Sequence, residues 1–90
     1  MEIIYHPLVT KVDIPKLDKP VKERIRVSIE SKLGTNPVLY GVPLRGTLRP
    51  LRKIRVGDYR VVFLIGQGKI FIIAIAHRKD IYTLVEKRKK

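Results

Sequence analysis

The sequence has 90 residues, of which 20 are Lys or Arg and 8 are Asp or Glu, so its formal net charge is +12. This length is typical of one domain, and we expect residues 1–90 to form it. The absence of cysteine excludes disulfides, thiolate nucleophiles and cysteine zinc sites. So large a positive charge disfavours a compact chain acting alone, and it indicates a polyanionic partner such as nucleic acid or an acidic protein.

Two features bear on location. The longest apolar run, residues 70–76, is far shorter than the ~20 residues of a membrane helix. The N-terminus has an acid at Glu2 and lacks the basic region and apolar core of a signal peptide. We therefore expect a cytoplasmic protein that does not contact a membrane.

The first third of the chain predicts one strand and one helix. Residues 1–5 are short, apolar and β-branched, which favours a strand. Pro15 permits at most a short helix before residue 17.

A longer helix is predicted over residues 19–33. Asp18 is its expected N-cap, Pro20 lies in its first turn, and Gly34 follows as its C-cap. Apolar residues recur every fourth position and form one stripe for the core. This stripe consists of Val21, Ile25, Ile29 and Leu33.

The remainder predicts a long loop and then a sheet. Residues 35–50 contain several Gly and Pro and are expected to be an ordered loop, which in a small domain is often functional. Residues 51–56, 59–65 and 69–77 read as an antiparallel three-strand meander. Residues 79–90 form either a short helix or a frayed basic tail. The predicted class is α+β, with a mainly antiparallel sheet packed with helices.

The first hairpin concentrates positive charge on one face. A two-residue turn at 57–58 pairs Arg55 with Arg60 and Lys53 with Val62. Directly paired residues point to the same face, so Lys53, Arg55 and Arg60 converge. Like charges across strands cost up to about 1 kcal/mol, which an anionic ligand would relieve.

The second hairpin extends this face, subject to its register. A three-residue loop at 66–68 would place Ala74 opposite Arg60 and bring Arg78 onto the face, whereas a two-residue loop would bring His77 there instead. We favour the first register because it sets small alanines beside bulky arginines and adds a fourth cation. A bulge would change it.

Other side chains complete the candidate site. Tyr82 follows Arg78 by one helical turn and is expected to lean over the same face. Two residues also have a structural interpretation: Arg60 as a half-buried partner of Glu23, Glu30 or Asp80, and His77 as a hydrogen-bonded residue at a strand end rather than a base. The cations expected to line the approach and bind phosphates are Arg45, Arg49 and Arg52.

Several known chemistries are not supported by the residues. The sequence has two His and no metal-ligand spacing, and it has no Walker-type loop, so we expect neither a metal nor a cofactor. Its serines lie on the predicted helix, which argues against a Ser-His-Asp triad. What remains is RNA cleavage, which needs a base near the 2′-hydroxyl, charge stabilisation of the phosphorane and an acid for the 5′-oxygen. These cations would serve an RNase or plain RNA binding equally well.

Three segments resemble the RelE/ParE superfamily of toxins from bacterial and archaeal toxin–antitoxin modules. They are LRG at 44–46, RKIRVGDYRVVF at 52–63 and AIAHRKDIY at 74–82. The order of the predicted elements is similar to that of the family as well. The resemblance implies a RelE-like fold over nearly the whole chain.

The resemblance to the RelE branch implies cleavage of mRNA in the ribosomal A site. By position, Lys53 and Arg55 match the two basic residues of the family's second strand, and Arg60, Arg78 and Tyr82 match its later arginines and its tyrosine. Lys53 or Tyr82 would then be the base, Arg60 would stabilise the phosphorane, and Arg78 or Lys53 would assist the leaving group.

The match to the family's site is incomplete. Arg55 stands where RelE has lysine, and arginine is the poorer proton donor. His77 resembles the histidine of YoeB-like members, but the matching loop has no evident acid.

Two alternatives remain open: a ParE-like inhibitor of DNA gyrase, and a non-catalytic protein that binds RNA or antitoxin. The joint presence of Lys53, Arg60, Arg78 and Tyr82 favours the RNase. The resemblance also implies an acidic, partly disordered antitoxin that covers the basic face, with salt-sensitive binding.

Overall fold

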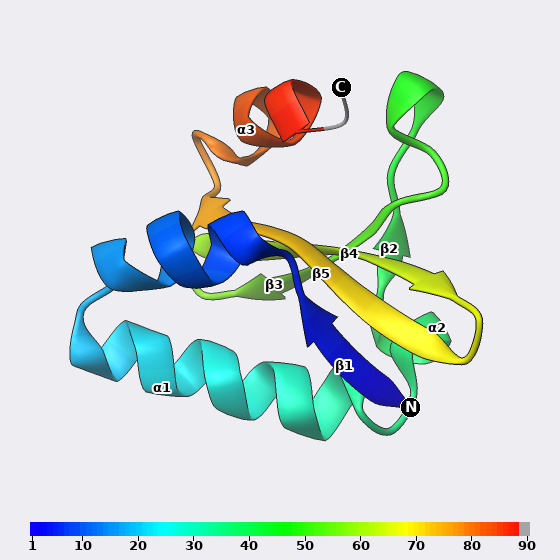
Figure 1. The fold of residues 1–90 in the computed structure, drawn as a ribbon, viewed down its shortest axis with the longest axis horizontal. Coiled ribbons are helices and arrows are strands. Elements are labelled where there is room, and N and C mark those ends of the chain that lie inside the picture. Colours follow the sequence, from blue (N-terminus) through cyan, green and yellow to red (C-terminus); the bar gives the residue numbers. More distant parts are fainter. Residues whose placement is uncertain (89–90) are drawn as a thin grey trace.

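The computed structural model describes residues 1–88, which form one sheet with helices on both faces (Figure 1). The sheet has five strands in the order β1-β5-β4-β3-β2, with β1 parallel to β5 and the other neighbours antiparallel. The α+β class, the N-terminal strand and the three-strand meander are confirmed. No helix within residues 1–88 is long and apolar enough to cross a membrane. The strands are β1 (Glu2–Tyr5), β2 (Val42–Pro43), β3 (Arg52–Val56), β4 (Tyr59–Gly66) and β5 (Lys69–His77).

Short helical turns connect β1 to the main helix. A π-helical turn, η1 (Val9–Asp13), leads into the 3-10 turn η2 (Ile14–Lys16), which contains the predicted helix breaker Pro15. The predicted helix at 19–33 is present as α1 (Lys19–Ser28), and a π-helical turn, η3 (Ile29–Leu33), continues it.

The ends of this helix differ in detail from the prediction. Asp18 occupies the N-cap position, but its side chain makes no capping hydrogen bond. Gly34 is the C-cap with an ordinary right-handed backbone, φ −66°. A Cβ at Gly34 would lie 2.4 Å from the carbonyl oxygen of Glu30, so close approach of backbone, and not a left-handed turn, requires glycine here.

The segment 35–50 is more structured than the predicted loop. It contains α2 (Pro37–Tyr40), β2 and the 3-10 turn η4 (Gly46–Leu48). The side chain of Asn36 accepts a hydrogen bond from the Leu39 N–H (3.0 Å) and so starts α2. Short elements of this kind depend on such local bonds and leave no periodic pattern in the sequence.

The two faces of the sheet bury separate cores. On one face, α1, η1 and η3 pack on Ile54, Val61 and Phe63. On the other, α3 (Ile81–Arg88) packs on Val62 and Ala74. Figure 1 shows α1 and α3 on opposite sides of the sheet. The tail expected at 79–90 therefore forms a docked helix as far as residue 88, and residues 89–90 lie outside the described part of the chain.

The second hairpin has a different register from the one predicted. Gly66 pairs with Lys69, so the loop has two residues and not three. A bulge then shifts the register between Val62 and Phe63, and Arg60 lies opposite Ala76 instead of Ala74. Because the extra residue of the bulge offsets the shorter loop, Ala74 and Ala76 share the Arg60 face as predicted, whereas Ile70 and Ile72, beyond the bulge, pack in the core on the opposite face.

Gly41 offers a test of the packing. A Cβ at Gly41 would lie 2.4 Å from Cζ of Phe63, whose side chain is fully buried. We expect Gly41→Ala to lower the free energy of unfolding by about 1–3 kcal/mol, the usual cost of overpacking. Denaturant unfolding measures this change. Gly66→Ala is the matched control, because the nearest atom to its Cβ is 4.0 Å away, and equal losses in the two variants would contradict the proposed contact.

Candidate functional site

Lys53 and Tyr82 meet on the face of the sheet that α3 covers. Lys53 lies on β3, and Tyr82 lies in the first turn of α3. The Lys53 Nζ donates to the Tyr82 hydroxyl at 2.6 Å and lies 5.2 Å from the centre of its ring. The Tyr82 side chain remains partly open to solvent, with 44% of the residue exposed. The structure therefore brings two titratable side chains, Lys53 of β3 and Tyr82 of α3, into contact at a position that solvent can reach.

Two guanidinium groups meet at the turn between β3 and β4. Arg55 and Arg60 lie directly opposite each other, as the two-residue turn predicted. Arg60 Nη1 donates to the carbonyl oxygens of Gly57 (3.1 Å) and Tyr59 (2.9 Å), and Arg55 Nε donates to that of Gly57 (3.4 Å). The shared carbonyl partly screens the two charges but neutralises neither. Their remaining N–H donors are suited to an anion.

Arg78 lies beside the same turn, one residue after the end of β5. Its backbone N–H donates to the carbonyl of Asp58 (2.7 Å), which fixes the chain next to the turn. Its guanidinium Nε lies 3.9 Å from the Asp58 carboxylate, and both side chains are mostly exposed. An exposed pair at this distance contributes little to stability, so the Arg78 charge is available to a ligand.

Two of the acids considered as partners of Arg60, Glu23 and Glu30, lie elsewhere. Glu23 and Glu30 both bind Arg26 on the surface of α1, and the hydrogen bond from Arg26 lowers the pKa of Glu23. Arg60 instead uses backbone carbonyls. Within residues 1–88, no three His, Asp or Glu side chains lie close enough together to hold a metal ion.

The other predicted residues are divided between the two faces. Arg45 and Arg49 flank η4 and are exposed, and Leu48 of this segment packs with the α3 core. Arg52 pairs with Phe63, on the opposite face from Lys53, and its Nη1 donates to the Gly41 carbonyl (3.0 Å). The structure does not bring Arg52 to the face of Lys53.

His77 also lies on the opposite face. It pairs with Tyr59, and the two rings meet edge to face with centres 5.6 Å apart. Its Nδ1 accepts a hydrogen bond from the Lys79 N–H (3.2 Å). These contacts match the structural interpretation of His77.

One buried pair is not evident from the sequence. Arg88 binds Asp13, and each side chain is 5% exposed or less. The sequence places Arg88 in a basic tail, 75 positions away from Asp13. The available signal is weak: an acid among apolar residues and a cation in phase with Ile81 and Val85 on the last turn of a helix.

Comparison with known proteins agrees with this fold. Residues 3–82 match the family described as "ParE toxin of type II toxin-antitoxin system, parDE". A curated relative, "Toxin RelE" of Mycobacterium tuberculosis (strain ATCC 25618 / H37Rv), is 34% identical over 89% of this chain and 88% of its own length. The chain belongs to the RelE/ParE superfamily. It is a type II toxin of the RelE type.

Solved structures share the toxin fold at low sequence identity. A chain of a RelBE toxin–antitoxin complex from Mycobacterium tuberculosis has a TM-score of 0.78 at 23% identity, over 86% of this chain and 96% of that chain. A mutant of the E. coli toxin RelE in the free state has a TM-score of 0.72 at 20% identity, over 97% of this chain and 95% of that chain. A chain of a RelB–RelE complex from Methanococcus jannaschii has a TM-score of 0.68 at 22% identity, over 89% of this chain and 95% of that chain.

The pairing of Arg55 with Arg60 has a measurable cost. We expect Arg55→Gln to raise the free energy of unfolding by up to about 1 kcal/mol at low salt, because it removes a like charge directly across the strands. The gain should shrink as added salt screens the two charges. Denaturant unfolding at two ionic strengths measures both effects. Lys11→Gln removes an exposed cation of η1 as a control, and an equal gain there would assign the effect to net charge alone.

Proposed function

We propose that this toxin is a ribosome-dependent endoribonuclease that cleaves mRNA. The observation that carries the proposal is the contact of Lys53 with Tyr82, at 2.6 Å, on the face that also holds Arg55 and Arg60. RNA cleavage needs a proton acceptor next to fixed positive charge, and this face supplies both. The 34% identical relative named RelE supports this branch of the family.

The reaction transfers the phosphorus between two oxygens of the RNA. The 2′-oxygen attacks the adjacent phosphorus and loses its proton to Tyr82 or Lys53, whichever of the pair is deprotonated. The bond from phosphorus to the 5′-oxygen breaks, and that oxygen takes a proton from Lys53, while the Arg78 guanidinium assists the leaving group through its charge. The products are a 2′,3′-cyclic phosphate and a 5′-hydroxyl, and no other reactant is consumed.

The arginines divide the remaining work. Arg60 is held from behind by the carbonyls of Gly57 and Tyr59, so its other N–H groups are fixed in direction and suited to stabilising the phosphorane. Arg55 holds its proton firmly and acts through charge, where RelE members have a lysine. Arg45 and Arg49 bind phosphates of the RNA next to the site. Arg52 lies on the opposite face of the sheet and has no part in the reaction.

The partners follow from the charge and from the relatives. A net charge of +12 suits an mRNA in the ribosomal A site and an acidic antitoxin. Two solved proteins of this fold come from toxin–antitoxin complexes, which supports an antitoxin as partner here. Its binding should weaken with salt because much of its attraction is electrostatic.

The catalytic pair can be tested by cleavage of mRNA on translating ribosomes. We expect Tyr82→Phe, which keeps the ring and removes the hydroxyl, to slow cleavage by about 10²-fold or more, as does Lys53→Gln. Primer extension on the mRNA measures the cuts. Lys79→Gln removes one exposed cation beside α3 and is the control. Wild-type rates in Tyr82→Phe and Lys53→Gln would remove both residues from the mechanism.

The family description also names ParE, so inhibition of DNA gyrase is the second candidate. Expression of the toxin without antitoxin separates the two functions. We expect incorporation of labelled amino acids to fall before DNA synthesis does, because translation loses its template. The opposite order would favour gyrase. An Arg60→Ala, Arg78→Ala double variant should abolish the early loss of translation if these arginines act on RNA.

A further inference from the structure

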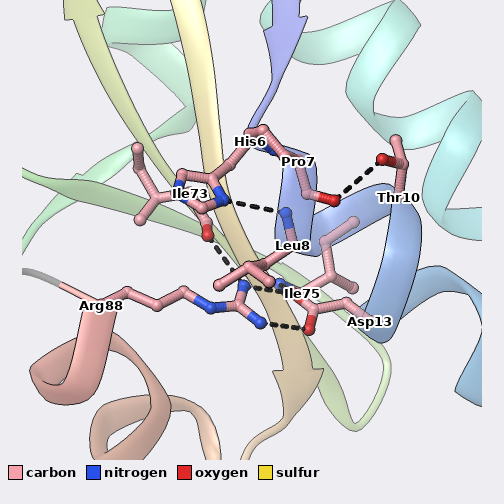
Figure 2. Close-up of polar contacts among 8 residues, drawn as sticks. All are labelled: His6, Pro7, Leu8, Thr10, Asp13, Ile73, Ile75 and Arg88. Carbon is pink, nitrogen blue, oxygen red and sulfur yellow. Dashed lines mark hydrogen bonds and ion pairs between the residues drawn. The ribbon is translucent and has the colours of Figure 1, made fainter.

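A buried ion pair joins Asp13, the last residue of η1, to Arg88, the last residue of α3. Asp13 Oδ1 lies 2.7 Å from Arg88 Nη2, and Asp13 Oδ2 lies 2.7 Å from Arg88 Nη1, so the contact is bidentate. The Arg88 and Asp13 side chains are only 5% and 3% exposed. Figure 2 shows the guanidinium reaching from α3 across the edge of β5 to the carboxylate at the end of η1.

The same two side chains bind the backbone of β5. Asp13 Oδ2 accepts from the Ile75 N–H (2.9 Å), and Arg88 Nη1 donates to the Ile73 carbonyl (3.0 Å) (Figure 2). Ile73 is the extra residue of the bulge, because Val62 pairs with Ala74 and Phe63 with Ile72. The pairing of β1 along β5 ends at Ile72. The ion pair thus occupies the edge of β5 where β1 stops.

Apart from its hydrogen bonds to Ile73 and Ile75, the attraction between the two charges does not by itself account for this pair. Replacing a buried ion pair with apolar side chains of similar volume is often neutral or stabilising. In addition, the Arg88 Nε–H is buried and has no hydrogen-bond partner among the described residues, which is a further cost. What the pair supplies is geometry, because it ties η1, the bulge and the last turn of α3 to one point.

Two parts of the proposed site, the sheet around Arg60 and Tyr82 on α3, depend on the position of this ion pair. The bulge sets the register that places Ala76, and not a larger side chain, opposite Arg60. The helix that ends at Arg88 carries Tyr82 six residues earlier, roughly 9 Å along its axis. A tilt of α3 about its packed middle would therefore move the Tyr82 hydroxyl away from Lys53.

We propose that Asp13 and Arg88 are a positioning pair for the catalytic face. They hold the β5 bulge in register and hold α3 at the angle that places the Tyr82 hydroxyl on Lys53. This inference rests on the proposed function for its kinetic consequence, but the placement of Tyr82 is open to direct observation.

The decisive variant is Asp13→Leu combined with Arg88→Met, which leaves the net charge unchanged and keeps the site filled. We expect it to fold, to cleave mRNA on ribosomes about 10²-fold more slowly at saturation, and to need the same ribosome concentration for half-maximal rate. In its NMR spectrum, the cross-peaks between the Tyr82 ring and the Lys53 side chain should be lost. A purely stabilising pair would leave both the saturating rate and these cross-peaks unchanged in the folded variant.

A matched control and a conservative variant complete the experiment. Arg26→Met combined with Glu30→Leu removes an exposed Arg–Glu pair between α1 and η3 and should keep the wild-type rate and cross-peaks. Arg88→Lys keeps a cation beside Asp13 but lacks the fork that also reaches the Ile73 carbonyl, so we expect an intermediate rate with weakened cross-peaks. If the double variant does not fold, Arg88→Lys serves as the test instead. A wild-type rate and intact cross-peaks in Arg88→Lys would then overturn the proposal.

The two proposals fail separately. If wild-type protein does not cleave mRNA, the proposed function is wrong, and the cross-peaks still decide whether the pair positions Tyr82. If wild-type protein cleaves and the Asp13→Leu, Arg88→Met variant matches it in rate and cross-peaks, the positioning role alone is wrong.

Discussion

A β-bulge leaves backbone N–H and carbonyl groups without partners in the neighbouring strand, and these groups need other hydrogen bonds. In β5, the buried carboxylate of Asp13 and the buried guanidinium of Arg88 supply them. Asp13 and Arg88 accept and donate at Ile75 and Ile73, next to the point where β1 ends its pairing. The bulge decides which side chains of β5 face α3, and the same arginine fixes the end of α3. On our proposal, this pair couples the register of the hairpin to the angle of α3, in addition to the apolar packing of α3 on Val62 and Ala74.

The face proposed to be catalytic, which holds Lys53, Arg55, Arg60 and Tyr82, carries an electrostatic cost that the rest of the fold offsets. Arg55 and Arg60 are held opposite each other, and Arg78 is fixed beside the same turn by its backbone. Two apolar cores, one on each side of the sheet, supply the stability that tolerates this crowding. Sites of this kind commonly trade stability for function, and an RNA or an acidic antitoxin would relieve the repulsion on binding.

The position of Tyr82 distinguishes this face from a plain basic surface. A cationic patch alone binds phosphates without regard to sequence or chemistry. Here one lysine ammonium contacts one phenol hydroxyl at 2.6 Å, and the pair is reached from solvent. On the opposite face, Arg52 contacts the Gly41 carbonyl and His77 contacts the Tyr59 ring, so the candidate site lies on the side of α3.

The sequence by itself determined the class, the strands and the first hairpin, because a two-residue turn and a period of two are local properties. These local properties are enough to place Lys53, Arg55 and Arg60 on one face. The predicted second register was wrong because a bulge depends on long-range partners, and Ala76 takes the place predicted for Ala74. The role of Arg88 is hidden in the sequence for the same reason: its partner Asp13 lies 75 residues away, and only the folded chain brings the two together. The position of the Tyr82 hydroxyl is likewise decided by the packing of α3, since a helix angle is a property of tertiary contacts and not of local sequence.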